Sequence, residues 1–287
     1  MKRRNVLSSP RLSELKRHRR RAVFSKVFVS LAGIVSVFAL LAYVSQLESL
    51  NISGVEVSGN KILDADAIKT SVQSELSGKY LWLFPKTNAL YFPKSGIKNA
   101  LSEKFKRIKE LNLSVKNNNK NLEVLLTERE PKYTWCGEDI SESREGNEQK
   151  CYFMDSEGYI FDNAPYFSGN VYFKFYGDIN KENPMGEPFL PGKFEGILKF
   201  KEAVEGMGLN PVAFWLEEKG DANFALSKEL TLGSKIIFRT EADFEKIAEN
   251  LQAAIATEPL KSKIKSSFSS LLYIDLRFGN KVYNKFR

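Results

Sequence analysis

The chain has 287 residues, 43% of them hydrophobic, which allows one or two folded domains with substantial cores. Its formal net charge is +8, but residues 1–26 contain ten Lys and Arg and one acid, a local charge of +9. The rest of the chain sums to −1, which excludes a folded domain with a broad basic face for nucleic acid. We interpret the basic tail as a membrane topology signal.

An uncharged apolar segment follows this tail. Residues 27–45 are 19 residues without a charged side chain. At ~1.5 Å per residue a helix of this length spans about 28 Å, close to the ~30 Å hydrocarbon core of a bilayer. Lys26 and Tyr43 suit the two interfaces, and cations before the segment place the N-terminus in the cytoplasm. We predict a single transmembrane helix over 27–47, in the cell (inner) membrane, with the rest of the chain outside the cytoplasm.

Two other interpretations of this segment are weaker. A cleaved signal peptide has a shorter apolar region of ~7–15 residues and a small-x-small cleavage site, which residues 42–44 match poorly. A buried core helix is not expected to be apolar all round beside an arginine cluster. His18, the single histidine of the sequence, lies within that cluster and is interpreted as a solvated residue.

Residues 50–130 predict a small α+β domain with the order β-α-α-β-β. A Gly59-Asn60 turn closes the first strand, and Asp64 is the predicted N-cap of the first helix. Residues 81–85, LWLFP, are expected to form an apolar bend. The predicted elements are a strand at 50–58, helices at 65–78 and 94–105, and alternating strands at 111–115 and 122–126, joined by a turn at 117–120.

This segment resembles a POTRA domain. Val55, Val57, Gly59 and Asn60 form a strand of the pattern V-x-V-x-G-N directly after the membrane segment, and the α-α-β-β order follows. The resemblance implies a binding module beside the bilayer and not an enzyme. The residues alone predict only that these apolar positions form the core of a small domain.

Beyond Pro131 the chain predicts a mixed, mainly antiparallel β domain over 131–287 with two helices. The helices have apolar residues at helical spacing, and the strands have alternating or aromatic-rich runs. The helices are predicted at 194–207 and 242–256, and the strands at 132–136, 151–155, 159–161, 171–176, 211–216, 222–226, 235–239, 271–278 and 281–286.

This second segment resembles the β domain of the bacterial cell-division family FtsQ/DivIB. Residues 152–161 match the family's D-x-x-G-x-x-F hairpin, residues 232–240 its strand-helix step, and residues 273–282, YIDLRFGNKV, its terminal signature. The polar stretch 137–150 departs from the pattern. The resemblance implies a divisome scaffold at the septum that uses no cofactor. Its implied partners are FtsB/DivIC-like and FtsL-like coiled-coil proteins, and its implied role is in the control of septal wall synthesis.

Catalytic chemistry has little support in the sequence. The domains after the tail contain no histidine, which excludes Ser-His and Cys-His dyads, and two cysteines cannot build a Cys₄ metal site. Asp275 is a conceivable general base, but a carboxylate within a strand more often pairs with a neighbour. We predict no catalytic, cofactor-binding or metal residues, no small-molecule substrate and no nucleic acid. A POTRA-type chaperone for polypeptide clients and an extracytoplasmic hydrolase are the alternatives to the scaffold.

Cys136 and Cys151 flank the polar stretch, and each adjoins a predicted strand. Outside the cytoplasm thiols oxidise, and a bridge closing this loop contributes ~3 kcal/mol by the chain-entropy relation. The alternative is two free buried cysteines on neighbouring strands. We favour the bridge.

The chain ends in a strand, residues 281–287, that is expected to form a sheet edge. Val282, Asn284 and Phe286 share one face, and Tyr283 faces the other way. An exposed edge can pair with an added strand, although the cations of this segment equally suit an edge protected against pairing.

The FtsQ/DivIB resemblance implies that this region receives an extended segment of the FtsB/DivIC partner. Tyr283 and Phe286 are the expected apolar anchors, and the cations are expected to steer an acidic segment. The predicted partner-binding residues are Tyr273, Lys281, Val282, Tyr283, Asn284, Lys285, Phe286 and Arg287.

Overall fold

The structure is a computed structural model, and the chain divides into two units that are described separately below. One unit comprises the chain up to Glu103 together with Glu110–Thr127, and the other comprises Lys104–Lys109 and Glu128–Arg287. The sequence placed the corresponding boundary at Pro131. The described residues are 10–116, 120–138, 150–167, 171–179, 183–217, 220–227 and 233–287, with side chains from Lys16 onward.

The first unit begins with a long helix, α1 (Pro10–Ser45). It has 36 residues, about 54 Å at 1.5 Å per residue, and an 18-residue stretch within Lys16–Ser45 has a mean hydropathy of 2.5. The helix is therefore long and apolar enough to span a membrane. The helix begins before the predicted transmembrane segment and also runs through the basic segment, because proline is tolerated in a first helical turn and Arg and Lys are good helix formers.

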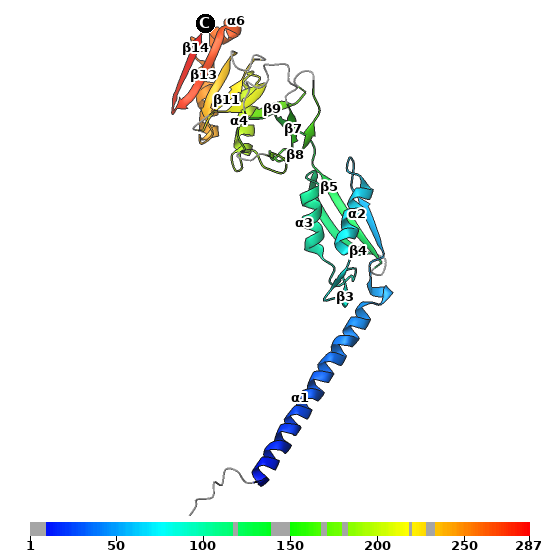
Figure 1. Ribbon diagram of the computed structural model, residues 1–287. Helices are drawn as coiled ribbons and strands as arrows, with labels where there is room; N and C mark the ends of the chain where they lie inside the picture. Colours follow the sequence, from blue (N-terminus) through cyan, green and yellow to red (C-terminus); the bar gives the residue numbers. More distant parts are fainter. Residues whose placement is uncertain are drawn as a thin grey trace, which may run out of the picture. The chain divides into compact units, whose positions relative to one another are not determined.

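A small α+β fold follows α1 and a short 3₁₀ turn, Glu48–Leu50 (Figure 1). Its sheet has the strand order β1-β5-β4, and β1 runs parallel to β5 with Val55 opposite Leu122. The three-stranded sheet and its two helices follow the predicted order β-α-α-β-β, and a further two-stranded hairpin lies between the helices in sequence. The elements are β1 (Gly54–Ser58), α2 (Ala65–Leu76), α3 (Lys94–Lys104), β4 (Ile108–Lys116) and β5 (Asn121–Glu128).

Local sequence explains these elements. The Asp64 side chain accepts hydrogen bonds from the backbone N–H groups of Asp66 and Ala67, which confirms it as the N-cap of α2. Both helices bury their apolar stripes, β5 buries the side chains of one face, and these side chains form the core of the unit. Its fully buried side chains include Ile68, Val72, Ile97, Leu101, Leu122 and Val124.

The predicted apolar bend is a small hairpin instead. β2 (Lys79–Tyr80) pairs antiparallel with β3 (Phe84–Pro85). Leu81 and Trp82 connect them in left-handed backbone conformations, with φ of 48° and 60°. Such strands of two residues are too short for alternation to predict.

The second unit is built on a nine-stranded sheet with the order β14-β13-β12-β11-β10-β9-β6-β7-β8. Five neighbouring pairs are antiparallel and three are parallel, so the sheet is mixed and mainly antiparallel, as predicted. Its strands are β6 (Tyr133–Trp135), β7 (Cys151–Met154), β8 (Ile160–Ala164), β9 (Phe173–Tyr176), β10 (Ala213–Leu216), β11 (Asp221–Ala225), β12 (Lys235–Arg239), β13 (Leu271–Phe278) and β14 (Lys281–Phe286).

Helices α4 (Phe194–Gly206, labelled in Figure 1) and α5 (Phe244–Ala256) pack against this sheet. The core between them and the sheet is rich in phenylalanine. The Phe238 ring lies 4.9 Å from Phe224 on the neighbouring strand and 5.0 Å from Phe200 of α4, measured between centroids. Side chains at alternate strand positions, including Tyr176 and Trp215, form a second, smaller cluster. The sheet is thus apolar on both faces in its middle strands.

A third helix of this unit, α6 (Leu260–Ser267), corrects the prediction of two helices. Its sequence LKSKIKSS has too few apolar residues to show a helical stripe, and of its side chains only Leu260 is buried. The short 3₁₀ turn Phe268–Ser270 then leads into β13.

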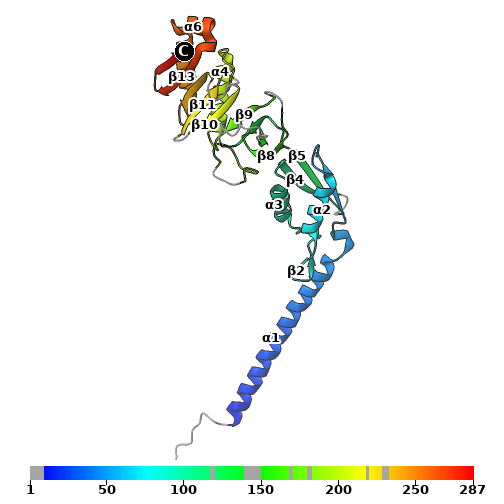
Figure 2. The same cartoon turned by 45° about the horizontal axis from the view of Figure 1, so that its top comes forward.

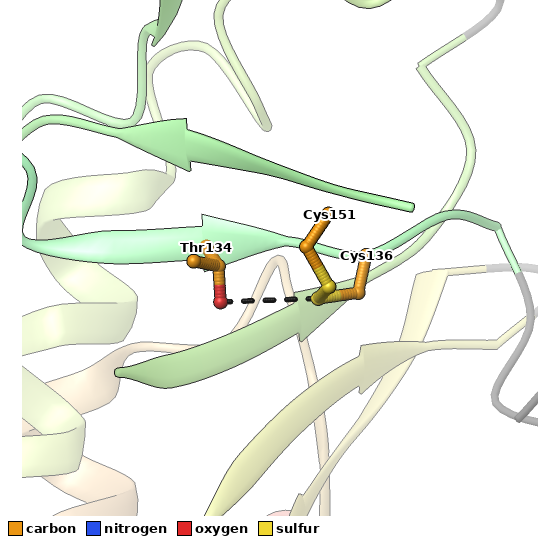
Figure 3. Close-up of a disulfide and its surroundings, with 3 residues drawn as sticks. All are labelled: Thr134, Cys136 and Cys151. Carbon is orange, nitrogen blue, oxygen red and sulfur yellow. Dashed lines mark hydrogen bonds between the residues drawn. A yellow bond between two sulfur atoms is a disulfide. The ribbon is translucent and has the colours of Figure 1, made fainter. Parts of the chain in front are cut away.

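Cys136 and Cys151 are joined by a disulfide, with their Cα atoms 4.1 Å apart (Figure 3). Cys151 begins β7, and Cys136 directly follows β6, the strand that pairs with β7. Cys136 is fully buried in the smaller apolar cluster, and Thr134 Oγ1 lies 3.8 Å from its sulfur. The bond therefore closes the polar loop at its base. Most of that loop, residues 139–149, lies outside the described residues, as do residues 117–119 of the turn predicted at 117–120.

Candidate partner-binding edge at the C-terminal strand

β14 is the edge strand of the nine-stranded sheet, so the predicted edge is confirmed. It pairs antiparallel with β13, with Ile274 opposite Asn284 and Asp275 opposite Tyr283. Gly279, with φ of 65°, makes the tight turn between the strands, and its carbonyl accepts a hydrogen bond from the side-chain amide of Asn250 on α5. The hairpin is thus held at its turn as well as along its ladder.

The register shows which backbone groups of β14 face outward. The Arg287 N–H donates to the Ser270 carbonyl over 2.8 Å, so it points toward β13. Both register shifts in the pair place the extra residue on β13, so alternation along β14 is uninterrupted. Lys285 and Tyr283 therefore direct their N–H and C=O groups inward, toward β13. The backbone groups of Val282, Asn284 and Phe286 point away from the sheet, where another strand can pair with them.

The burial of the β14 side chains follows the predicted alternation only in part, because Asn284 is exposed while the other two residues of its face are not. Val282 and Phe286 are half-buried and pack against the main core, and the Lys263 ammonium lies 5.3 Å from the centroid of the Phe286 ring. Tyr283 is 48% exposed and contacts Phe278 edge to face, with centroids 5.2 Å apart. The two expected anchors therefore differ. Tyr283 is accessible to a partner, whereas the Phe286 side chain already packs against the core of its own unit.

The structure adds a site residue that sequence reasoning missed. Phe278 is 54% exposed and lies beside Tyr283 because a two-residue turn brings the ends of β13 and β14 together. The signal that the sequence offered was an aromatic residue directly before the Gly279-Asn280 turn. Tyr273, in contrast, is half-buried between Lys235 of β12 and Lys285 of β14.

The edge is flanked by cations. Lys281 and Lys285 are exposed on β14, and Arg287 is exposed directly after it. Helix α6 adds exposed lysines at 261, 263 and 265, and its contact with Phe286 through Lys263 places it beside the end of the strand. This positive charge favours an acidic ligand.

Arg277 forms hydrogen bonds and ion pairs with two carboxylates close to this edge. Its guanidinium donates to both carboxylate oxygens of Asp275, over 2.9 and 2.6 Å, and to Asp221 of β11 over 2.5 Å. Burial acts to raise the pKa of Asp275, but the hydrogen bonds from Arg277 outweigh it and hold that pKa below its ordinary value. A carboxylate with a lowered pKa is a poor general base near neutral pH, so the geometry favours a structural role for Asp275.

Among the described residues, no group of three or more His, Cys, Asp or Glu side chains is arranged to hold a metal ion. Neither a protein-family model nor a curated protein matches the chain. The hypotheses about its role consequently depend on its own residues and geometry.

Proposed function

We propose that this chain is a membrane-anchored scaffold of bacterial cell division, similar to the FtsQ/DivIB family. In this proposal α1 crosses the inner membrane with its basic end in the cytoplasm, and the first unit is a POTRA-like module beside the bilayer. The second unit binds FtsB/DivIC-like and FtsL-like coiled-coil proteins outside the cytoplasm and helps control septal wall synthesis.

The observation that carries the proposal is the open edge of β14. Val282, Asn284 and Phe286 turn their backbone groups outward, Tyr283 is accessible on one face, and cations border the strand. Strand addition takes affinity from such backbone groups and specificity from the flanking side chains. An extended, acidic segment of the FtsB/DivIC-like partner fits this edge.

Proline at position 284 tests strand addition directly. Asn284→Pro removes one outward N–H and places a ring where the added strand must lie, while the ladder to β13 stays intact. Loss of one backbone hydrogen bond together with the steric clash is expected to weaken binding by about tenfold or more, roughly 1.4 kcal/mol. Binding of the purified partner to the full chain in lipid nanodiscs measures this effect.

Two matched variants serve as controls. Asn284→Ala keeps the N–H and is expected to bind like the wild type, whereas Lys285→Pro removes an inward N–H and is expected to lower the stability of the β13–β14 pair. If Asn284→Pro retains normal thermal stability and binds the partner as tightly as the wild type, strand addition at β14 is wrong.

A POTRA-type chaperone is the second candidate, favoured by the β-α-α-β-β order of the first unit. Imaging a fluorescent N-terminal fusion separates the two. Accumulation at midcell supports the division scaffold. An even membrane distribution, together with capture of unfolded polypeptides by the purified chain, supports the chaperone.

A further inference from the structure

The β2–β3 hairpin is held against the apolar end of α1. The Phe84 ring on β3 meets Phe38 of α1 edge to face, with centroids 5.2 Å apart. The side-chain amide of Gln46 donates to the Leu83 carbonyl over 3.2 Å, and that of Asn88 donates to the Ser45 carbonyl over 3.0 Å. Several independent contacts therefore fix residues 79–91 beside the last two turns of the helix (Figure 2).

These contacts place the hairpin at a definite depth. Phe38 precedes Ser45, the end of the apolar segment, by seven residues, which corresponds to about 10 Å along a helix. A side chain that touches Phe38 consequently lies alongside the apolar part of α1 and not beyond it. If α1 crosses a bilayer, Phe84 lies at the level of the outer leaflet.

The hairpin and the turn after it present apolar side chains outward. Trp82 is 92% exposed, Leu90 77%, Leu81 73% and Leu83 42%. Leu81 and Trp82 also adopt left-handed backbone conformations, which non-glycine residues seldom do. The fold thus holds two large apolar side chains at an exposed tip, an arrangement that water disfavours.

Aromatic and basic residues surround this apolar tip. Tyr80 and Tyr91 contact each other with ring centroids 6.2 Å apart, and Lys86 lies 5.9 Å from the centroid of the Tyr80 ring. Lys79 adds an exposed cation at the start of β2. Tyrosine, tryptophan and lysine are the side chains that suit the headgroup region of a bilayer, and the lysines attract anionic lipids.

We propose that residues 79–91 insert into the outer leaflet of the bilayer that α1 crosses. Leu81, Trp82 and Leu90 enter the acyl-chain boundary, and the tyrosines and lysines lie among the headgroups. The inference rests on the proposed membrane anchoring of α1 and goes beyond it, because it gives the first unit a second, lipid-binding contact that limits its tilting relative to the bilayer.

Tryptophan quenching tests this insertion in the full chain. The sequence has three tryptophans, and Trp135 and Trp215, both in the other unit, are at most 9% exposed. The difference in emission between the wild type and Trp82→Phe therefore reports Trp82. The protein is reconstituted into vesicles of phosphatidylethanolamine and phosphatidylglycerol, with or without bromine on the acyl chains. Bromolipids are expected to quench most of the Trp82 emission, and aqueous iodide is expected to leave it unchanged.

A second variant separates failure of the insertion from failure of the anchor. Val35 of α1 is 60% exposed, so Val35→Trp in the Trp82→Phe background reports whether α1 lies in the bilayer. If bromolipids quench the tryptophan emission of the Val35→Trp variant but not that of Trp82, the inference is overturned and the membrane anchoring of α1 is still supported. Absence of quenching at both positions overturns both. Trp82 emission that becomes shielded from iodide only when a partner protein is added assigns the hairpin to protein binding and also overturns the inference.

Discussion

Arg277 connects the strands behind the proposed binding edge, and its replacement by methionine gives the sharpest test of the packing there. The guanidinium joins Asp275 on β13 to Asp221 on β11, and methionine keeps an apolar stem while removing every donor. Asp275 is only 5% exposed, so the variant leaves a buried carboxylate without its main partner.

The size of the effect follows from burial. Breaking a fully buried ion pair costs about 3–5 kcal/mol. The side chains of Arg277 and Asp221 are 28% and 22% exposed, so water compensates part of the loss. We expect Arg277→Met to lower the unfolding free energy by about 2–3 kcal/mol at pH 7, which corresponds to a Tm decrease on the order of 5–10 °C for a unit of this size.

The stability difference between the wild type and Arg277→Met is expected to depend on pH. The folded-state pKa of Asp275 is lowered by Arg277, so the pair contributes its full stability above the unfolded pKa of about 3.9. This contribution is lost as the pH falls through the lower, folded-state pKa. The difference between the wild type and Arg277→Met is therefore expected to shrink in acid. Chemical denaturation followed by tryptophan fluorescence, at pH 7 and in a series toward pH 3, measures it.

Two results would refute this reasoning. One is a variant as stable as the wild type at pH 7. The other comes from the double variant Asp275→Asn with Arg277→Met, which removes the unpaired charge and should be more stable than Arg277→Met alone. If the double variant is no more stable, an unpaired Asp275 is not the source of the loss.

Two further predictions concern stability elsewhere in the second unit. Replacing Cys136 and Cys151 by serine opens a bridge with a sequence separation of 15 and is expected to cost about 3 kcal/mol in chemical denaturation. Mass spectrometry of the non-reduced wild type should find no free thiol, and two free thiols would contradict the bridge. Gly158→Ala places a Cβ 2.8 Å from the Phe194 ring at φ of +81°, so it should lower stability by about 2–5 kcal/mol in thermal unfolding. Gly279→Ala, at φ of +65° in open space, should cost only about 1–2 kcal/mol, and equal losses for the two variants would contradict this explanation.

Much of the secondary structure follows from local sequence patterns. The bounds of β12, β13 and β14 agree with the alternating runs predicted at 235–239, 271–278 and 281–286. The α2 helix begins after Asp64 as predicted, because a capping carboxylate and an apolar stripe are both local signals. The side-chain alternation of β14 likewise needed only the period of a strand.

Tertiary structure alone decided which strands are neighbours and which groups face outward. β9 lies between β6 and β10, parallel to both, because pairing depends on contacts between distant segments. Arg277 reaches Asp221, 56 positions away in sequence, and the β2–β3 hairpin meets Phe38 for the same reason. Periodicity reports that a face is buried but not what buries it. The sequence therefore determined the long apolar helix, the order of the two units and the terminal edge strand, whereas long-range packing set the outward backbone groups of β14 and the exposed apolar tip beside α1.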